Sequence, residues 1–247
     1  MATFKDRTGE RHFSNQGEMC EIIKYINNKC VTIQFKDGTI VEALPYNDIK
    51  NGKIKNPNKG VVFNIGFIGQ GKYTSTIEGK KTKYYDCWYN MLTRGYDEKY
   101  KQKQPTYKEV TVCKEWHNFQ NFAKWHEENY REDYELDKDI LIKGSKIYSP
   151  KTCAFVPAEI NMLFVKSNSK RGNLPIGVHK DKNGFQAGLN KEGDSIYIGY
   201  FNTPQEAFQA YKTVKEDYIK EVADLWKNKI AEPIYTALIN YQVEITD

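Results

Sequence analysis

Apolar and polar residues alternate over 20–25 and 31–35, which is the pattern of half-buried β-strands. The tetrapeptide KDGT at 36–39, followed by the apolar pair Ile40 and Val41, predicts a tight hairpin, because Asp-Gly tolerates the positive φ of such a turn. Short strands joined by tight turns, with no helical period, predict a small β-barrel over residues 1–58.

A helical period appears further along the chain. Apolar residues at 84, 88, 91 and 92 predict one helix, and those at 116, 119, 122, 123 and 126 predict a second. Strand, loop, strand and helix patterns then follow one another over 136–161. The helix of this ββα unit is expected to begin near Pro157.

The last third of the chain shows strand patterns at 174–180, 185–189 and 195–201. Thr203 and Pro204 then predict a helix start, and an apolar stripe follows from Ala207 to Tyr218. A helical tail continues to Tyr241 with a break at Pro233. We therefore predict an α+β multi-domain protein: a β-barrel over 1–58, a ββα module with helices over 59–165, and a three-stranded antiparallel sheet plus helix over 166–247.

Composition narrows the class of protein. Of the 247 residues, 39% are hydrophobic and 28% charged, and no stretch is apolar enough to span a bilayer, so we expect no membrane partner. No apolar signal-peptide region follows Met1, and the five cysteines form no CxxC pair. Reduced thiols and a cytoplasmic location are expected.

The net charge of +5 is small, but the charges are unevenly distributed. Residues 50–83 hold eight lysines against one acid, whereas 127–139 hold seven acids against two bases. A basic arm could bind phosphates and an acidic cluster a divalent cation. The same pattern would arise if both segments were simply exposed to solvent, with the basic segment serving as a linker. The candidate phosphate contacts of the arm are Lys53, Lys55, Lys59 and Lys72.

Several motifs point to a known family. They are YxxWxxMLxR at 85–94, VCxEWxNFxNF at 112–122, LDxD at 136–139 and YSPxxCxFVPxEIN at 148–161. This region resembles the HNH (ββα-metal) endonucleases of phages, including homing nucleases, and 17–57 resembles the small Src-homology-type barrel that begins many such proteins. The resemblance implies an infected bacterial host, a Mg²⁺ or Mn²⁺ ion, and Asp137 and Asn161 as its ligands.

The family's general-base position holds Lys138 instead of histidine, and its loop-orienting Asn position holds Thr152. A lysine between two carboxylates is expected to be charged near pH 7 and therefore unable to accept a proton. Three alternatives stay open: His117 or His126 as the base, a metal-activated water that needs no side-chain base, or no catalysis.

The C-terminal third resembles the ethylene-response-factor (APETALA-type) DNA-binding domain, through GFQA at 184–187, IGYF at 198–201 and NTPQEAFQAY at 202–211. The resemblance implies a sheet that lies in the major groove of double-stranded DNA. The family's usual arginines are largely missing, and Gln186 is suited to reading adenine. The matching candidate contacts are Arg171, His179, Lys180, Lys182, Phe185 and Gln186.

The leading interpretation is an HNH-family DNA endonuclease or nickase that hydrolyses phosphodiesters with Mg²⁺. The alternative is a catalytically inactive relative that acts as a DNA-binding regulator, or as a phage protein that blocks a host enzyme or defence system. A third class, a protein-interaction scaffold, predicts no affinity for DNA.

Overall fold

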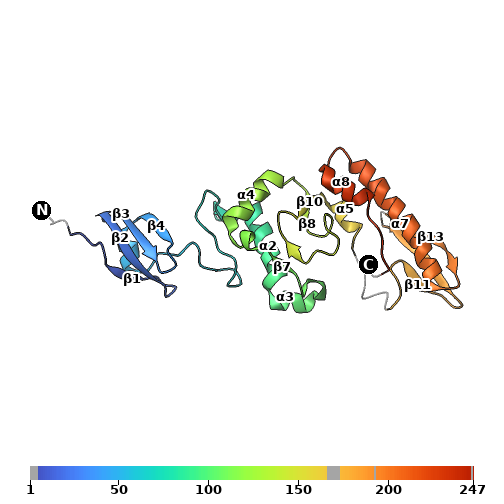
Figure 1. Ribbon diagram of the computed structural model, residues 1–247, viewed down its shortest axis with the longest axis horizontal. Helices are drawn as coiled ribbons and strands as arrows, with labels where there is room; N and C mark the ends of the chain where they lie inside the picture. Colours follow the sequence, from blue (N-terminus) through green and yellow to red (C-terminus); the bar gives the residue numbers. More distant parts are fainter. Residues whose placement is uncertain (1–4, 166–172, 192, 246) are drawn as a thin grey trace. The chain divides into compact units, whose positions relative to one another are not determined.

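The computed structural model describes residues 5–165, 173–191, 193–245 and 247, and these form a mixed α+β fold (Figure 1). Backbone contacts divide the chain into two compact units, Met1–Glu127 and Glu128–Asp247. This division falls inside the central module predicted over 59–165. The domain boundaries predicted at 58/59 and 165/166 stay predictions.

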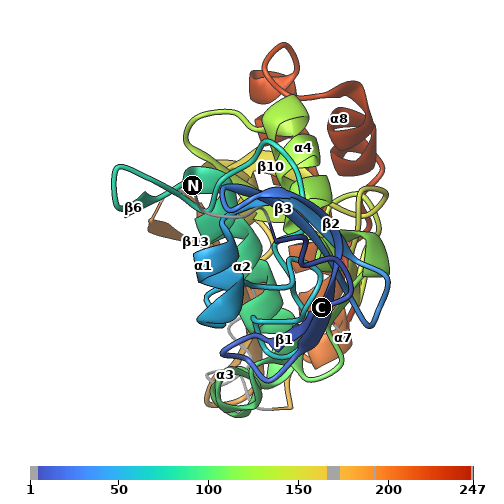
Figure 2. The same cartoon turned by 90° about the vertical axis from the view of Figure 1, so that its left-hand side faces the viewer.

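The N-terminal strands form an antiparallel sheet in the order β1 (Arg11–Phe13), β2 (Met19–Asn27), β3 (Cys30–Phe35), β4 (Ile40–Leu44). Figure 2 shows β2 and β3 side by side. The predicted hairpin between β3 and β4 is confirmed, with Gly38 at φ +86°. Ile22, Ile33 and Ile49 are fully buried beneath the sheet.

The closed barrel predicted for this region does not form among the residues that the structure describes. In the order β1-β2-β3-β4, strands β1 and β4 are the two edges of an open sheet. After β4 the chain enters the short helix α1 (Tyr46–Lys50), whose N-cap is Pro45. Because proline has no N–H to donate to a ladder, it ends β4 before a closing pair can form.

The glycine-rich basic segment after this sheet is tied to a helix. The side chain of Gln120 donates to the carbonyls of Ile68 and Tyr73, at 3.2 and 2.9 Å, and accepts the N–H of Tyr73 at 3.0 Å. A Cβ on Gly71 would lie 2.3 Å from the Gln120 oxygen, so glycine permits this close approach. The short strands β5 (Thr76–Ile77) and β6 (Lys80–Lys81) then form an exposed hairpin.

The two helices predicted from the apolar period are confirmed as α2 (Lys83–Tyr96) and α4 (Phe119–Asn129). Between them lie α3 (Glu98–Lys103), the 3-10 turns η1 (Pro105–Tyr107) and η2 (Lys114–His117), and β7 (Thr111–Val112). Their core is aromatic: the rings of Trp88 and Phe119 lie 5.4 Å apart, and those of Trp116 and Phe122 lie 5.1 Å apart.

The unit Glu128–Asp247 begins with the predicted ββα arrangement. Strand β8 (Tyr134–Asp137) pairs antiparallel with β10 (Ala154–Pro157), β9 (Ile147–Tyr148) lies in the connecting loop, and α5 (Ala158–Met162) follows. A second antiparallel sheet has the order β11 (Val178–Lys180), β12 (Phe185–Lys191), β13 (Asp194–Phe201). Helix α7 (Pro204–Trp226) packs on it, and α8 (Glu232–Ile239) follows (Figure 1).

One hydrophobic core serves both parts of this unit. The same cluster contains Val156 and Ile160 from the ββα region and Val178 and Phe208 from the sheet and α7. Polar contacts reinforce it: Trp226 Nε1 on α7 donates to the Glu159 carboxylate at 2.9 Å. The ββα region and the three-stranded sheet are therefore held in fixed relation by packing.

Helix α7 begins where the sequence predicts. Thr203 is the N-cap, its hydroxyl accepts the N–H of Glu206, and the Glu206 carboxylate accepts the N–H of Thr203. This capping box satisfies two N–H groups that the helix itself leaves unpaired.

Gly177 offers a test of how closely α7 packs under the sheet. It has φ +75°, and a Cβ there would lie 2.0 Å from the Tyr211 ring, whereas Gly193 has φ +94° and open space around it. We expect Gly177→Ala to lower the free energy of unfolding by about 3 kcal/mol and Gly193→Ala by about 1 kcal/mol. Urea denaturation measures both, and equal losses would contradict the close approach.

Candidate functional site

Asp137 lies at the end of β8, opposite Ala154 of β10. Its Oδ1 accepts the backbone N–H groups of Asp139 and Ile140, both at 2.7 Å, so the carboxylate closes the turn that follows the strand. Burial raises the pKa of Asp137, and the two N–H donors oppose that shift. Among the described residues, Oδ2 has no hydrogen-bond partner, which leaves one carboxylate oxygen available to a cation.

Lys138, at the position that the HNH resemblance assigns to the base, is a buried cation with a partner. Its side chain is 9% exposed, and its ammonium donates to Asp139 Oδ2 at 2.6 Å. An ammonium engaged in this way donates protons and does not accept them. The contact strengthens the sequence-based argument against Lys138 as a base.

Asn161 on α5 turns toward β8, but to a residue that the sequence analysis did not single out. Its Nδ2 donates to Glu135 Oε2 at 2.5 Å. Glu135 and Asp137 are two residues apart on β8, so their side chains leave the same face of the strand. Their spacing in the sequence could have identified Glu135 as a further candidate ligand. Its carboxylate is a second one beside the predicted ligand Asn161.

Thr152, at the loop-orienting position, holds the loop in place. Its buried hydroxyl donates to the carbonyl of Ile147 at 2.7 Å and accepts the N–H of Ser149 at 3.1 Å. A hydroxyl therefore supports the connection between β8 and β10.

A hard divalent ion requires oxygen ligands, and Mg²⁺ commonly takes one or two carboxylates together with waters and substrate phosphate. The carboxylates of Asp137 and Glu135 and the side-chain oxygen Oδ1 of Asn161 are that type of donor. No group of three or more His, Cys, Asp or Glu placed to hold a metal occurs in the described part of the chain. The donor set therefore fits only an ion that is held partly by water and substrate.

The two candidate histidine bases both belong to the unit Met1–Glu127 and are engaged there. His117 Nε2 lies 2.9 Å from the Tyr96 hydroxyl and 3.0 Å from the carbonyl oxygen of Val112. His126 is 4% exposed, and its ring contacts the rings of Tyr84 and Phe122. Burial, and secondarily the charge of Lys83, lowers the pKa of His126 to about 4. Both placements are those of structural histidines.

The three-stranded sheet has one face on α7 and one open face. Val178, Ala187 and Leu189 point into the core, so their neighbours in sequence point outward. The register aligns His179, Gln186 and Tyr200 in a row across the open face. Tyr200 is 45% exposed and Tyr197, beside this row, is 64% exposed.

Tyr197 and Tyr200 were not among the residues predicted to contact DNA. The signal that could have found them is the pairing of β12 with β13, which aligns Tyr200 with Gln186 and Tyr197 with Gly188. Exposed aromatic rings of this kind are suited to contacts with base edges or sugars. The open face therefore carries aromatic and polar groups in place of the arginines that the resemblance would suggest.

The other predicted DNA contacts of this module lie as follows. His179, Lys180 and Lys182 are exposed. Phe185 packs against the core with the ammonium of Lys180 4.3 Å from its ring centre, and Gln186 Nε2 donates to Asp181 Oδ2 at 2.6 Å. Arg171 lies outside the described residues.

The candidate lysines of the basic arm fall into two groups. Lys53 and Lys55 are exposed, because they alternate with the buried residues Ile54 and Asn56. Lys59 donates to the carbonyl of Gln16 at 3.1 Å, and Lys72 donates to Glu127 at 3.0 Å. Surface ion pairs are weak, so Lys72 could exchange its carboxylate for a phosphate at small cost.

Comparison with known proteins assigns no family. No protein-family model matches the chain, and no curated protein or solved structure matches it either. None of the helices that the structure describes has both the length and the apolar character needed to cross a membrane.

His126 gives a pH-dependent prediction. Between about pH 6.5 and pH 4 the unfolded chain binds a proton at this residue and the folded chain does not, so stability falls as the pH falls, by about 3 kcal/mol across the window. Urea denaturation at a series of pH values should show this loss. His126→Gln should remove that component, whereas the exposed control His179→Gln should retain it; an unchanged pH profile in His126→Gln would contradict the assignment.

Proposed function

We propose that the protein binds double-stranded DNA through the open face of the sheet β11-β12-β13. The observation that carries this proposal is the row of exposed His179, half-buried Gln186 and exposed Tyr200, with Lys180 at the end of the edge strand β11 and Lys182 in the turn that follows. The major groove of B-DNA, about 12 Å wide, admits a small β-ribbon. The resemblance to the ethylene-response-factor domain supports the same placement.

The candidate residues are suited to two kinds of DNA contact, with phosphates and with base edges. Lys180 and Lys182 are suited to phosphate contacts, which position a protein on DNA without reading sequence. Tyr197, Tyr200 and Gln186 are suited to the base edges. Gln186 already donates to Asp181 at 2.6 Å, so reading adenine with its amide requires that contact to be exchanged.

Removing the two lysines should change the salt dependence of binding. We expect Lys180→Ala with Lys182→Ala to reduce the slope of log affinity against log salt by about 2, and to weaken binding by about tenfold per lysine near 0.1 M salt. Fluorescence anisotropy with duplex DNA measures both quantities. Lys220→Ala, an exposed lysine of α7, is the matched control, and an equal loss in the control would contradict the proposal.

Removing a groove-facing aromatic ring should change the affinity for DNA but not its salt dependence. We expect Tyr200→Ala to weaken binding while the salt slope stays unchanged, because the ring neutralises no phosphate. The same anisotropy titration compares it with Tyr130→Ala, a tyrosine outside the sheet that contacts Phe155. Unaltered affinity in Tyr200→Ala would remove the ring from the interface.

Metal-dependent phosphodiester hydrolysis is the second candidate function, and the free Oδ2 of Asp137 favours it. Asp137 and Asn161 would hold Mg²⁺ or Mn²⁺, with Glu135 beside Asn161. The ion, when bound, would stabilise charge that develops on the phosphate. Lys138 would remain a cation paired with Asp139 and add positive charge near the backbone of the DNA.

A nicking assay tests the second candidate. Supercoiled DNA is incubated with the protein and Mg²⁺ or Mn²⁺, and we expect the parent to nick it and Asp137→Asn to lose at least about a hundredfold in rate. The asparagine keeps an oxygen that can accept the two N–H groups of the turn, so the fold is retained. Binding without cleavage by the parent would leave the inactive DNA-binding regulator as the function, and no binding at low salt would favour a protein-directed role.

A further inference from the structure

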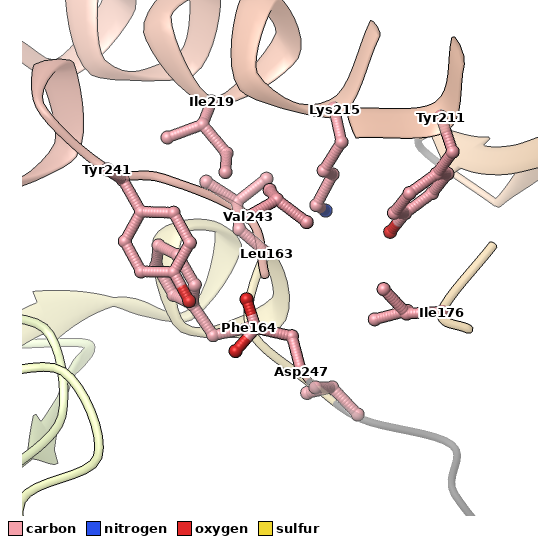
Figure 3. A pocket seen from close by; sticks show the side chains of 10 residues that line it. Leu163, Phe164, Ile176, Tyr211, Lys215, Ile219, Tyr241, Val243 and Asp247 are labelled. Atoms are coloured by element: carbon pink, nitrogen blue, oxygen red, sulfur yellow. The ribbon is translucent and has the colours of Figure 1, made fainter. Parts of the chain in front are cut away.

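A small cavity within the unit Glu128–Asp247 lies against a buried lysine. It has a volume of about 20 Å³ and lies between α7, the segment that follows α5, and the C-terminal residues Tyr241, Val243 and Asp247 (Figure 3). Most of its wall is apolar, as in Leu163, Ile176, Ile219 and Val243. A space of this size holds one or two water-sized particles, so no organic substrate fits.

Lys215 is the polar group that helix geometry directs into this cavity. Tyr211, Lys215 and Ile219 follow one another at intervals of four, which places them on one face of α7. Lys215 is 9% exposed. Figure 3 shows its amine in the space between Val243 and Ile176, with the hydroxyl of Tyr211 directed toward the same space.

The ammonium of Lys215 has no hydrogen-bond or ion-pair partner among the residues described. It lies over the ring of Tyr218, 5.6 Å from the ring centre, as a cation–π contact. Asp247 also lines the cavity, but its carboxylate accepts from Lys143 at 2.8 Å and from the N–H of Glu244 at 2.9 Å.

A neighbouring lysine on the same helix has the polar partners that the Lys215 ammonium lacks in the described part of the chain. Lys212, one turn earlier on α7, donates to the carbonyl of Val243 at 2.7 Å and pairs with Glu216 at 3.1 Å. Burial lowers the pKa of Lys215 to about 8, so the group is still mostly charged at pH 7. A largely buried ammonium whose described contact is an aromatic ring is costly, and an ion of opposite sign would offset that cost.

We propose that this cavity binds one small monovalent anion of halide size, such as chloride, against the ammonium of Lys215. The charge of the anion would neutralise the lysine inside a low-dielectric wall, where Coulomb attraction is strong. The residues that line the cavity include neither Asp137 nor the row on the open sheet face, and the site does not depend on the proposed DNA binding.

The size and character of the space favour a halide over other occupants. A space with room for one or two water-sized particles favours a monatomic ion over sulfate or phosphate, which carry four oxygens. Water fits and can accept one hydrogen bond from the ammonium, but it brings no charge. A weakly hydrated anion such as chloride or bromide loses less solvation energy than fluoride when it enters an apolar wall.

A bound anion would join α7 to the C-terminal segment. Val243 and Asp247 form part of the same wall as Lys215, and the segment is also held by Lys212, Lys143 and Glu216. The kind of anion in solution would therefore affect how firmly Val243 and Asp247 pack against α7, apart from any general effect of ionic strength.

Thermal unfolding of the full chain tests the site. The midpoint is measured in sodium chloride, sodium bromide and sodium gluconate at equal ionic strength and at pH 7. With the anion in tenfold excess over its dissociation constant, we expect the halides to raise the midpoint by about 3–6 °C relative to gluconate. An equal midpoint in all three salts would overturn the proposal.

Two variants separate the site from surface effects. Lys215→Met removes the charge at similar volume and should abolish the halide-dependent shift, while Lys220→Met, an exposed lysine of the same helix, should keep it. Retention of the shift in Lys215→Met would also overturn the proposal.

Crystals of the parent protein soaked in bromide give a test that needs no variant. An anomalous peak within about 3.5 Å of Lys215 Nζ, at hydrogen-bond distance, would support the site. Density for water alone in the cavity, with bromide bound elsewhere, would refute it even if Lys215→Met did not fold.

Discussion

The packing of α7 against two neighbours is the constraint on which the unit Glu128–Asp247 depends. One side of the helix covers the sheet, and its last residues reach the ββα region, where Trp226 donates to Glu159. Because both parts share one core, the distance between the open sheet face and Asp137 is set by side-chain packing and not by a linker. A protein that must both bind a duplex and present a carboxylate to it would benefit from this rigidity.

Local signals made much of the fold predictable. The Asp-Gly turn at 37–38, the apolar period of α2 and α4 and the Thr203 cap all act within a few residues, and the structure contains each of them. The barrel was wrong because closure depends on pairing between strands far apart in sequence, and Pro45 directs the chain into α1. The hydrogen bonds between Gln120 and the segment 68–73 could not be predicted for the same reason, because they join residues far apart in the sequence.

The candidate site was predictable in its residue types but not in its partners. The sequence indicated Asp137 and Asn161, yet only the fold pairs Asn161 with Glu135 and leaves one oxygen of Asp137 free. Lys215 resembles any solvated lysine of a charged helix until the packing of the C-terminal segment buries it. Long polar side chains reach partners that tertiary structure chooses, so composition and spacing do not reveal them.

The shared core also determines how such a chain could be cut and recombined. Separating residues after 165 would strip Val156 and Ile160 of the apolar surface that α7 and the sheet provide. An exchange of coding segments that preserves a folded product would carry residues 128–247 as one block. The smallest segment that could be exchanged and still fold is therefore larger than the three-stranded sheet and helix predicted from the sequence.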